Sequence, residues 1–259
     1  MAAILYRAEI MGMYVDRGGS GDPVLLLLHG LGATGTVWLE LAELLPRHWP
    51  GSWVIPDLPG HGRSDPLPRY TFGALAAAVA EAVEPGRRIA VLGHSLGGAV
   101  GLALASGWFG VQVGAVCGLG IKVRWSPEEL ARSTELAARP ARAFPTREAA
   151  VERSLKIAGL TGLLAPDSPL AAPGITRGDD GWRLTLDPAA FAVGAPDMPG
   201  LLTACRAEVI LAAGEHDPMS PREHLLALQS DPVTLPALGH NAHVEDPLAL
   251  LDILDRLDG

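Results

Sequence analysis

The fold is decided by the stretch Ile89-Ala-Val-Leu-Gly-His-Ser-Leu-Gly-Gly98, which leads directly into an alanine- and leucine-rich segment. Residues 89–92 are apolar throughout, as expected of a central parallel strand, and residues 96–105 have the length and spacing of a covering helix. Ser95 is therefore predicted on a sharp strand-to-helix turn. Gly93 and Gly97 leave room for this turn, because side chains there would collide with the neighbouring strand and helix. This arrangement is typical of a nucleophilic serine.

The same alternation continues on both sides of the turn. Short apolar runs predict strands, and longer periodic segments predict helices. The expected strands are an edge hairpin at residues 4–15, broken near Gly12, and runs at 24–28, 53–56, 89–92, 111–117, 209–213 and 233–236. The expected helices lie at residues 37–45, 71–84, 96–105, 223–229 and 248–257. The fold class is therefore α/β, with a mostly parallel central sheet and helices on both faces.

The regular alternation stops near Lys122 and resumes near Arg206. Ser126 begins a capping box with proline at the first helical position, and Thr146 begins a second helix that is expected to end at Gly159. A short helix is also expected at residues 187–191. We interpret residues 122–201 as a mostly helical lid inserted in a core made of residues 1–121 and 202–259. A helical extension with no role in binding is the alternative.

A serine hydroxyl is a poor nucleophile at neutral pH, so it needs a histidine base and a carboxylate that orients the base. Asp217 follows the strand predicted at residues 209–213, and His240 follows the run at 233–236. Ligands of open α/β sheets bind at the carboxyl ends of the strands, where both residues are expected. Glu215 is the second choice for the acid, and His243 is the rival for the base.

The chain order Ser95, Asp217, His240 is that of a nucleophile-elbow hydrolase, and here the sequence resembles the α/β-hydrolase family. His29-Gly-Leu-Gly32 is similar to that family's oxyanion loop, and the segment 57–65 is similar to its loop after the fourth strand. The resemblance implies that Ser95 is the nucleophile, His240 the base and Asp217 the orienting acid. It favours His240 over His243 because glycine precedes His240. It also implies an oxyanion hole formed by backbone N–H groups of Leu31 and Leu96.

Residues close to these motifs are candidates for contact with the substrate. They are His29, Gly30, His94, Trp38 and Trp125, although His29 is favoured as a hydrogen-bonding residue that shapes the oxyanion loop. Apolar residues of the expected lid are candidates for the wall of an acyl pocket or for the lid's own packing face: Leu130, Leu136, Phe144, Leu155, Leu160, Leu163, Leu164 and Phe191.

A serine nucleophile indicates acyl transfer through a covalent ester, and Ser95 speaks against the family branches that open epoxides or displace halide with an aspartate. The leading hypothesis is a carboxylic-ester hydrolase for a small to medium, largely apolar substrate. A thioesterase, a lactonase and a carbon–carbon bond hydrolase remain open because they share the triad. A binding protein on a hydrolase scaffold, without turnover, is the hypothesis from another class.

The composition of the chain limits the classes of partner that it is expected to bind. The chain has 259 residues, of which 48% are hydrophobic, and 20 basic against 29 acidic residues give a net charge of −9. This sign argues against binding to nucleic acid or to an anionic membrane. No apolar run approaches the ~20 residues of a membrane span, no signal peptide is recognised, and two cysteines fit a reduced cytoplasm. We expect a small-molecule substrate, no cofactor, no metal, and either a monomer or a homodimer.

Overall fold

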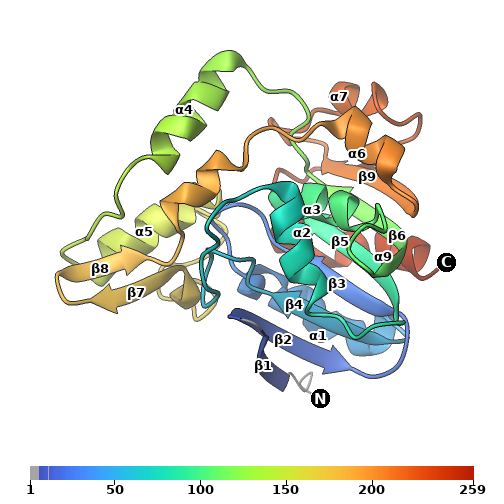
Figure 1. Cartoon of the computed structure of the whole chain (residues 1–259), viewed down its shortest axis with the longest axis horizontal. Coiled ribbons are helices and arrows are strands. Elements are labelled where there is room, and N and C mark those ends of the chain that lie inside the picture. Colours follow the sequence, from blue (N-terminus) through green and yellow to red (C-terminus); the bar gives the residue numbers. More distant parts are fainter. Residues whose placement is uncertain (1–5, 11) are drawn as a thin grey trace.

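The computed structural model of the protein describes residues 6–10 and 12–259, and its centre is an eight-stranded sheet (Figure 1). Across the sheet the strands lie in the order β1-β2-β4-β3-β5-β6-β9-β10. Their bounds are β1 (Tyr6–Ile10), β2 (Met13–Gly19), β3 (Val24–Leu28), β4 (Ser52–Pro56), β5 (Arg88–His94), β6 (Gln112–Leu119), β9 (Glu208–Gly214) and β10 (Val233–Leu235). The pairs β1–β2 and β2–β4 are antiparallel, and every other pair is parallel. The prediction of a mostly parallel sheet is confirmed. Residues 4, 5 and 11 of the expected hairpin lie outside the described residues.

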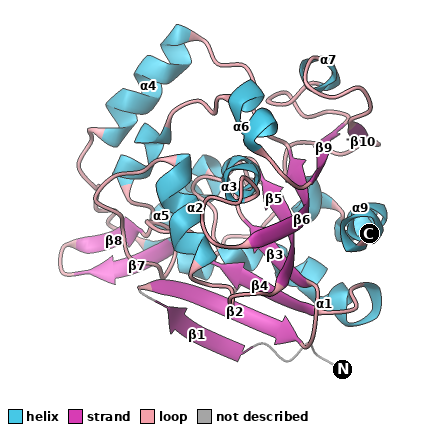
Figure 2. Cartoon of the chain, turned by 45° about the vertical axis from the view of Figure 1, so that its right-hand side comes forward, coloured by secondary structure: helices cyan, strands magenta, loops and turns pink. Residues whose placement is uncertain are grey.

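Helices cover both faces of this sheet, as predicted (Figure 2). Side chains of α2 and α3 belong to the core on one face, where α6 also packs, and side chains of α1 and α9 belong to the core on the other. The bounds of the helices outside residues 122–201 are η1 (Gly35–Trp38), α1 (Leu39–His48), α2 (Phe72–Ala80), α3 (Leu96–Leu104), α7 (Arg222–Leu226), α8 (Ala242–Glu245), η4 (Pro247–Leu250) and α9 (Leu251–Asp258), where η marks a 3₁₀-helix.

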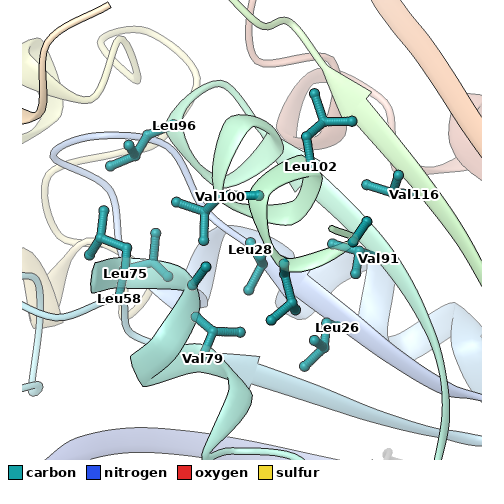
Figure 3. Close-up of a cluster of buried hydrophobic side chains, with 14 of the residues drawn as sticks. Leu26, Leu28, Leu58, Leu75, Val79, Val91, Leu96, Val100, Leu102 and Val116 are labelled. Carbon is teal, nitrogen blue, oxygen red and sulfur yellow. The ribbon is translucent and has the colours of Figure 1, made fainter. Parts of the chain in front are cut away.

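Strand β3 shows why this sheet is buried on both faces. Its four leucines are fully buried, and because successive side chains of a strand point to opposite faces, they divide between the two cores. Leu26 and Leu28 pack with residues of α2 and α3 such as Val79 and Val100 (Figure 3), whereas Leu25 and Leu27 pack on the other face. The carboxyl end of β3 therefore rests on a core that is packed on both sides.

Residues 122–201 lie between β6 and β9 and are less purely helical than the sequence indicates. The segment between β6 and β9 forms α4 (Pro127–Ala137), α5 (Arg147–Ile157), η2 (Ala172–Gly174), β7 (Ile175–Gly178), β8 (Gly181–Leu184), η3 (Pro188–Val193) and α6 (Met198–Ala204), and the last of these helices crosses the expected boundary at residue 201. The predicted capping box at Ser126 is present. The β7–β8 hairpin was not predicted. It is anchored by two backbone hydrogen bonds between Phe144 and Trp182, which are far apart in the sequence and gave no local signal.

A buried carboxylate, Asp57, joins the loop that follows β4 to the loop that follows β3, and it forms an ion pair with Arg63 of its own loop. The Asp57 carboxylate is fully buried and accepts hydrogen bonds from the Gly35 amide (2.7 Å), the Arg63 amide (3.0 Å) and the Arg63 guanidinium (2.7 and 3.1 Å). Burial alone would raise the pKa of this carboxyl, but the hydrogen bonds and the charge of Arg63 outweigh it and hold the pKa below its usual value. Asp57 thus fixes the loop that leads from β3 to α1.

We predict that Asp57→Ala lowers the free energy of unfolding by about 3 kcal/mol, because it leaves two amides without their acceptor and removes the shortest ion pair of Arg63, whose other anionic partner, Asp16, is 3.9 Å away. The matched control is Asp180→Ala, which removes an exposed ion pair with Arg183 on the β7–β8 turn and should leave the midpoint of unfolding almost unchanged. Urea unfolding of the two variants and the wild type measures both. Equal losses in the two variants would contradict this role of Asp57.

Candidate active site

Ser95 lies between β5 and α3 in a backbone conformation that is unusual for a residue with a side chain. Its φ is 50° and its ψ is −112°, and its amide donates a hydrogen bond to the Leu119 carbonyl of β6 (2.8 Å). Such conformations cost of the order of 1–3 kcal/mol and persist only where the surroundings enforce them. The predicted turn is therefore present, and it is strained at the serine itself.

The two flanking glycines are required by close backbone contacts. A Cβ atom at Gly93 would lie 2.3 Å from the Gly97 carbonyl oxygen, and one at Gly97 would lie 2.3 Å from the Leu28 carbonyl oxygen. The sequence argument named the right cause, a collision with the neighbouring strand and helix, and the structure identifies the atoms. These contacts press the turn against the end of β3.

Asp217 and His240 form a hydrogen-bonded pair at the ends of β9 and β10. His240 Nδ1 lies 2.9 Å from Asp217 Oδ2, and the other carboxylate oxygen accepts hydrogen bonds from the amides of Met219 (2.8 Å) and Ser220 (3.2 Å). The Asp217 side chain is fully buried. Because a carboxylate accepts, Nδ1 carries a proton, and in the neutral form of the ring Nε2 then has the lone pair.

Glu215, the other candidate acid, has a different place. Its carboxylate accepts a hydrogen bond from the Ala237 amide (2.9 Å), and its own amide donates to the Leu235 carbonyl (2.8 Å). It therefore ties the loop after β9 to the loop after β10, which holds Asp217 and His240 near each other.

A cavity of about 310 Å³ opens beside Ser95. Ser95 and His240 both line it, together with Gly30 and Leu31 of the loop after β3 and Leu96 of α3. Leu96 is the first residue of α3, and the first amides of a helix have no partner within the helix. Gly30 approaches so closely that a Cβ there would lie 3.4 Å from the Ser95 Cβ. The structure thus brings the nucleophile candidate, the base candidate and the expected oxyanion loop to one cavity.

The candidates for substrate contact divide into two groups. Gly30, His94 and Trp125 line the cavity, whereas His29 and Trp38 do not. His29 is fully buried: its Nε2 accepts from the Leu58 amide (2.8 Å) and its Nδ1 donates to the Gly30 carbonyl (2.8 Å), so it shapes the loop.

Trp38 is also fully buried, and its ring packs 4.4 Å from that of His243. Its place in the core leaves it no surface to offer a ligand, so Trp38 is not a contact in this structure. The apolar residues listed above for the expected lid do not line the cavity either, and four of them belong to the core: Phe144, Leu155, Leu160 and Leu164. The wall is made instead by neighbours such as Ile157, Ala158, Val193 and Pro196.

His94 has a role that the sequence did not reveal. Its Nε2 donates a hydrogen bond to the His240 carbonyl (2.9 Å), and the two rings lie 4.6 Å apart. Burial, and then the adjacent rings of His243 and His240, hold the pKa of His94 well below its usual value. A neutral His94 thus fixes the backbone of His240. The two residues are 146 positions apart in the sequence, so no local sequence pattern predicts this contact.

His243, the rival base, lies behind the cavity wall. It is 1% exposed, it packs between Trp38 and His94, and neither of its ring nitrogens has a hydrogen-bond partner among the described residues. Burial, and next the nearby His240, lower the pKa of His243 to about 3. The geometry therefore pairs His240, and not His243, with Asp217.

A family model described as "Alpha/beta hydrolase family" matches residues 25–253. The chain belongs to the alpha/beta hydrolase family. Among curated proteins, this chain is 41% identical over 100 residues to the magnesium-chelatase 30 kDa subunit of Rhodobacter capsulatus, covering 35% of this chain and 33% of that protein. It is 37% identical over 100 residues to the lipase LipV of Mycobacterium tuberculosis, covering 38% and 37%. The matched stretch spans about a third of the length of these relatives.

Solved structures share the fold of the hydrolase over almost its whole length. A thioesterase domain from the curacin biosynthetic pathway superposes with a TM-score of 0.74 at 21% identity, covering 98% of this chain and 99% of that one. An esterase of M. tuberculosis superposes with a TM-score of 0.75 at 22% identity, covering 100% and 93%. At these identities the likeness is one of fold.

Two other kinds of feature are absent from the described residues. None of their helices is long and apolar enough to cross a membrane. They also hold no group of three or more His, Cys, Asp or Glu side chains arranged to bind a metal ion.

We predict that His243 makes the hydrolase less stable in acid. With a pKa of about 3 in the folded state and ~6.5 in the unfolded chain, His243 takes up a proton only on unfolding as the pH falls below ~6.5. Its contribution to stability is therefore complete above that pH and declines toward pH 3, at up to about 1.4 kcal/mol per pH unit. Urea unfolding between pH 7.5 and 4.5 should give a shallower slope for His243→Leu than for the wild type. Identical slopes would contradict a buried, neutral His243.

Proposed function

We propose that this hydrolase cleaves carboxylic esters of small to medium, largely apolar substrates through an acyl-enzyme intermediate on Ser95. One observation carries the proposal: Ser95, held on a strained turn, shares a cavity with His240, whose other ring nitrogen is hydrogen-bonded to the buried Asp217. A serine, a base and an orienting acid in this relation are the parts that nucleophilic catalysis requires.

In the first step, Ser95 Oγ attacks the ester carbonyl carbon while His240 Nε2 takes the hydroxyl proton. Asp217 keeps the imidazole in the right tautomer and stabilises its positive charge. The carbonyl electrons move to oxygen. When the tetrahedral intermediate collapses, the bond to the alcohol oxygen breaks and His240 returns the proton to that oxygen. An alcohol leaves, and Ser95 carries the acyl group.

The negative charge on the carbonyl oxygen requires donors that are already in place. We assign this role to the backbone N–H groups of Leu31 and Leu96, because both residues line the cavity from opposite sides of the turn, one after β3 and one at the start of α3. Gly30 supports the assignment, since a Cβ there would lie 2.8 Å from His94 Nδ1, so its lack of a side chain lets this loop approach the turn that carries Ser95.

In the second step, water attacks the acyl carbon, His240 takes one water proton, and the collapse of the second intermediate returns that proton to Ser95 Oγ. The acid product then leaves and the enzyme is restored. His94 supports both steps as a positioning residue, because it holds the backbone of His240 without occupying the place of the base.

The substrate class rests on the shape and lining of the cavity. Its volume of about 310 Å³ lies at the lower end of the range for small-molecule sites, and its wall includes Phe72, Ile121 and Val193. The likeness to a lipase over 100 residues supports an ester over the thioester, lactone and carbon–carbon alternatives. We further propose that residues 122–201 act as a lid on a core of residues 1–121 and 202–259, because Trp125, Ile157 and Val193 of that segment line the cavity.

We predict that Ser95→Ala and Asp217→Asn each lower kcat by roughly 10³- to 10⁴-fold or more on 4-nitrophenyl hexanoate, because the nucleophile is lost in one and the imidazole tautomer in the other. Glu215→Gln is the matched control, because its side-chain amide oxygen can still accept the hydrogen bond from the Ala237 amide that ties the two loops, so most of the activity should be retained. Circular dichroism checks that each variant folds. Wild-type protein without turnover of any ester, or an equal loss in the two acid variants, would contradict the proposal.

A further inference from the structure

The cavity has an unusual balance of charge. The chain contains only two lysines, Lys122 and Lys156, and both line the cavity. No aspartate or glutamate stands among the described residues of its wall. Acidic residues outnumber basic residues by 29 to 20 in the whole chain, so the charged side chains of the cavity wall are positive although the net charge of the protein is negative. A cationic wall attracts an anionic ligand.

Lys122 is already engaged by its neighbours. Its ammonium pairs with the Glu129 carboxylate of α4 and lies 4.8 Å from the centre of the Trp125 ring, and its carbonyl accepts a hydrogen bond from Trp125 Nε1 (3.0 Å). Glu129 also closes the capping box at the start of α4. Lys122 therefore holds Trp125 and α4 together, and its charge is balanced.

Lys156 is different because its charge is not balanced. It lies in the last turn of α5, it is exposed, and the structure gives its ammonium no ion pair or hydrogen bond within the described chain. A cation in the last turn interacts favourably with the helix dipole, but that interaction does not require the side chain to line a cavity. Arg153, one turn earlier on α5, is exposed and does not line it.

The backbone that carries Lys156 is anchored to the catalytic machinery on two sides. Ile157 packs against the loop after β3, where a Cβ at Gly32 would lie 2.6 Å from its Cγ2 atom. The Gly159 carbonyl accepts a hydrogen bond from Asn241 Nδ2 (3.0 Å), and Asn241 follows the base candidate His240. Lys156 therefore stands on a support that is fixed relative to both Ser95 and His240, as a specificity residue requires.

We propose that the natural ester carries a negatively charged group, and that the Lys156 ammonium binds this group while Ser95 attacks the carbonyl carbon. The substrate class is thus an ester with an apolar body and an anionic end, such as a carboxylate. This inference rests on the proposed esterase function. It adds the charge of the substrate to that function, because Ser95, His240 and Asp217 would act on charged and neutral esters alike.

The test compares esters that differ only at their far end. Mono-4-nitrophenyl esters of linear dicarboxylic acids with six to ten carbons are each paired with the monocarboxylic ester of the same carbon number. At the preferred length, Lys156→Met should lower the ratio of kcat/KM values, charged over neutral, by about 10- to 100-fold, the range for a hydrogen bond to a charged group. Lys156→Arg should keep most of the preference. The matched control Arg153→Met removes a charge from the same helix and should leave the ratio unchanged.

A second pair places the charge on the alcohol side, with 4-carboxyphenyl hexanoate and phenyl hexanoate. A ratio that falls in Lys156→Met for either set supports the proposal and shows which side of the ester carries the charge. Ratios that are the same in wild type and Lys156→Met for both sets would overturn it, as would an equal fall in Arg153→Met.

A binding measurement separates this proposal from the proposed activity. Adipamate and hexanamide have the same length and an amide in place of the ester, and they differ only in the terminal carboxylate. Calorimetry should show tighter binding of adipamate by the wild type and loss of that preference in Lys156→Met, even if no ester is turned over. If the wild type binds adipamate more tightly but turns over no ester, the esterase proposal is refuted and the anion site is not. A second amide pair, 4-carboxyhexananilide and hexananilide, places the carboxylate on the alcohol side. Absence of the preference in both pairs would refute the anion site.

Discussion

The close approach of the β5–α3 turn to the end of β3 is the constraint on which the site depends. Gly97 meets the Leu28 carbonyl at a distance that admits no Cβ, and Gly93 meets the Gly97 carbonyl in the same way. This packing forces Ser95 to a positive φ and sets its side chain beside the loop that carries Gly30 and Leu31. The strained conformation of Ser95 is maintained because the sheet is buried on both faces. Moving β3 away from β5 would disrupt the packing of both cores.

The remaining parts of the site are brought to this turn by hydrogen bonds between loops. Glu215 joins the loops after β9 and β10, so that Asp217 and His240 meet, and His94 holds the His240 carbonyl. His94 and its neighbour His243 are buried and neutral: burial is the main cause that holds the pKa of His94 well below its usual value and lowers the pKa of His243 to about 3. Among these histidines, His240 is the one whose ring is hydrogen-bonded to a carboxylate, that of Asp217. The unbalanced positive charge of the cavity then comes from Lys156.

The sequence predicted the elements that carry strong local signals. The strand-to-helix turn at Ser95, the buried leucines of residues 24–28 and the capping box at Ser126 all follow from spacing and residue type, and each is present. The β7–β8 hairpin and the apolar part of the cavity wall contributed by Ile157, Ala158, Val193 and Pro196 were missed because tertiary contacts determine them. Trp38 illustrates the limit: its position after the oxyanion loop suggested a ligand contact, whereas its side chain turns into the core and packs on His243. Lys156 was missed because a lone lysine in a helix has no local pattern.

The central claim is that Ser95 is a nucleophile activated by His240 and Asp217. The most direct test is covalent labelling with a fluorophosphonate, which reacts with an activated serine, followed by mass spectrometry of the intact protein and of its peptides. The account predicts one adduct per chain, located on Ser95 and absent from Ser95→Ala, with labelling slowed by several orders of magnitude in His240→Ala. A folded wild-type protein that is not labelled, or equal labelling of Ser95→Ala, would contradict it.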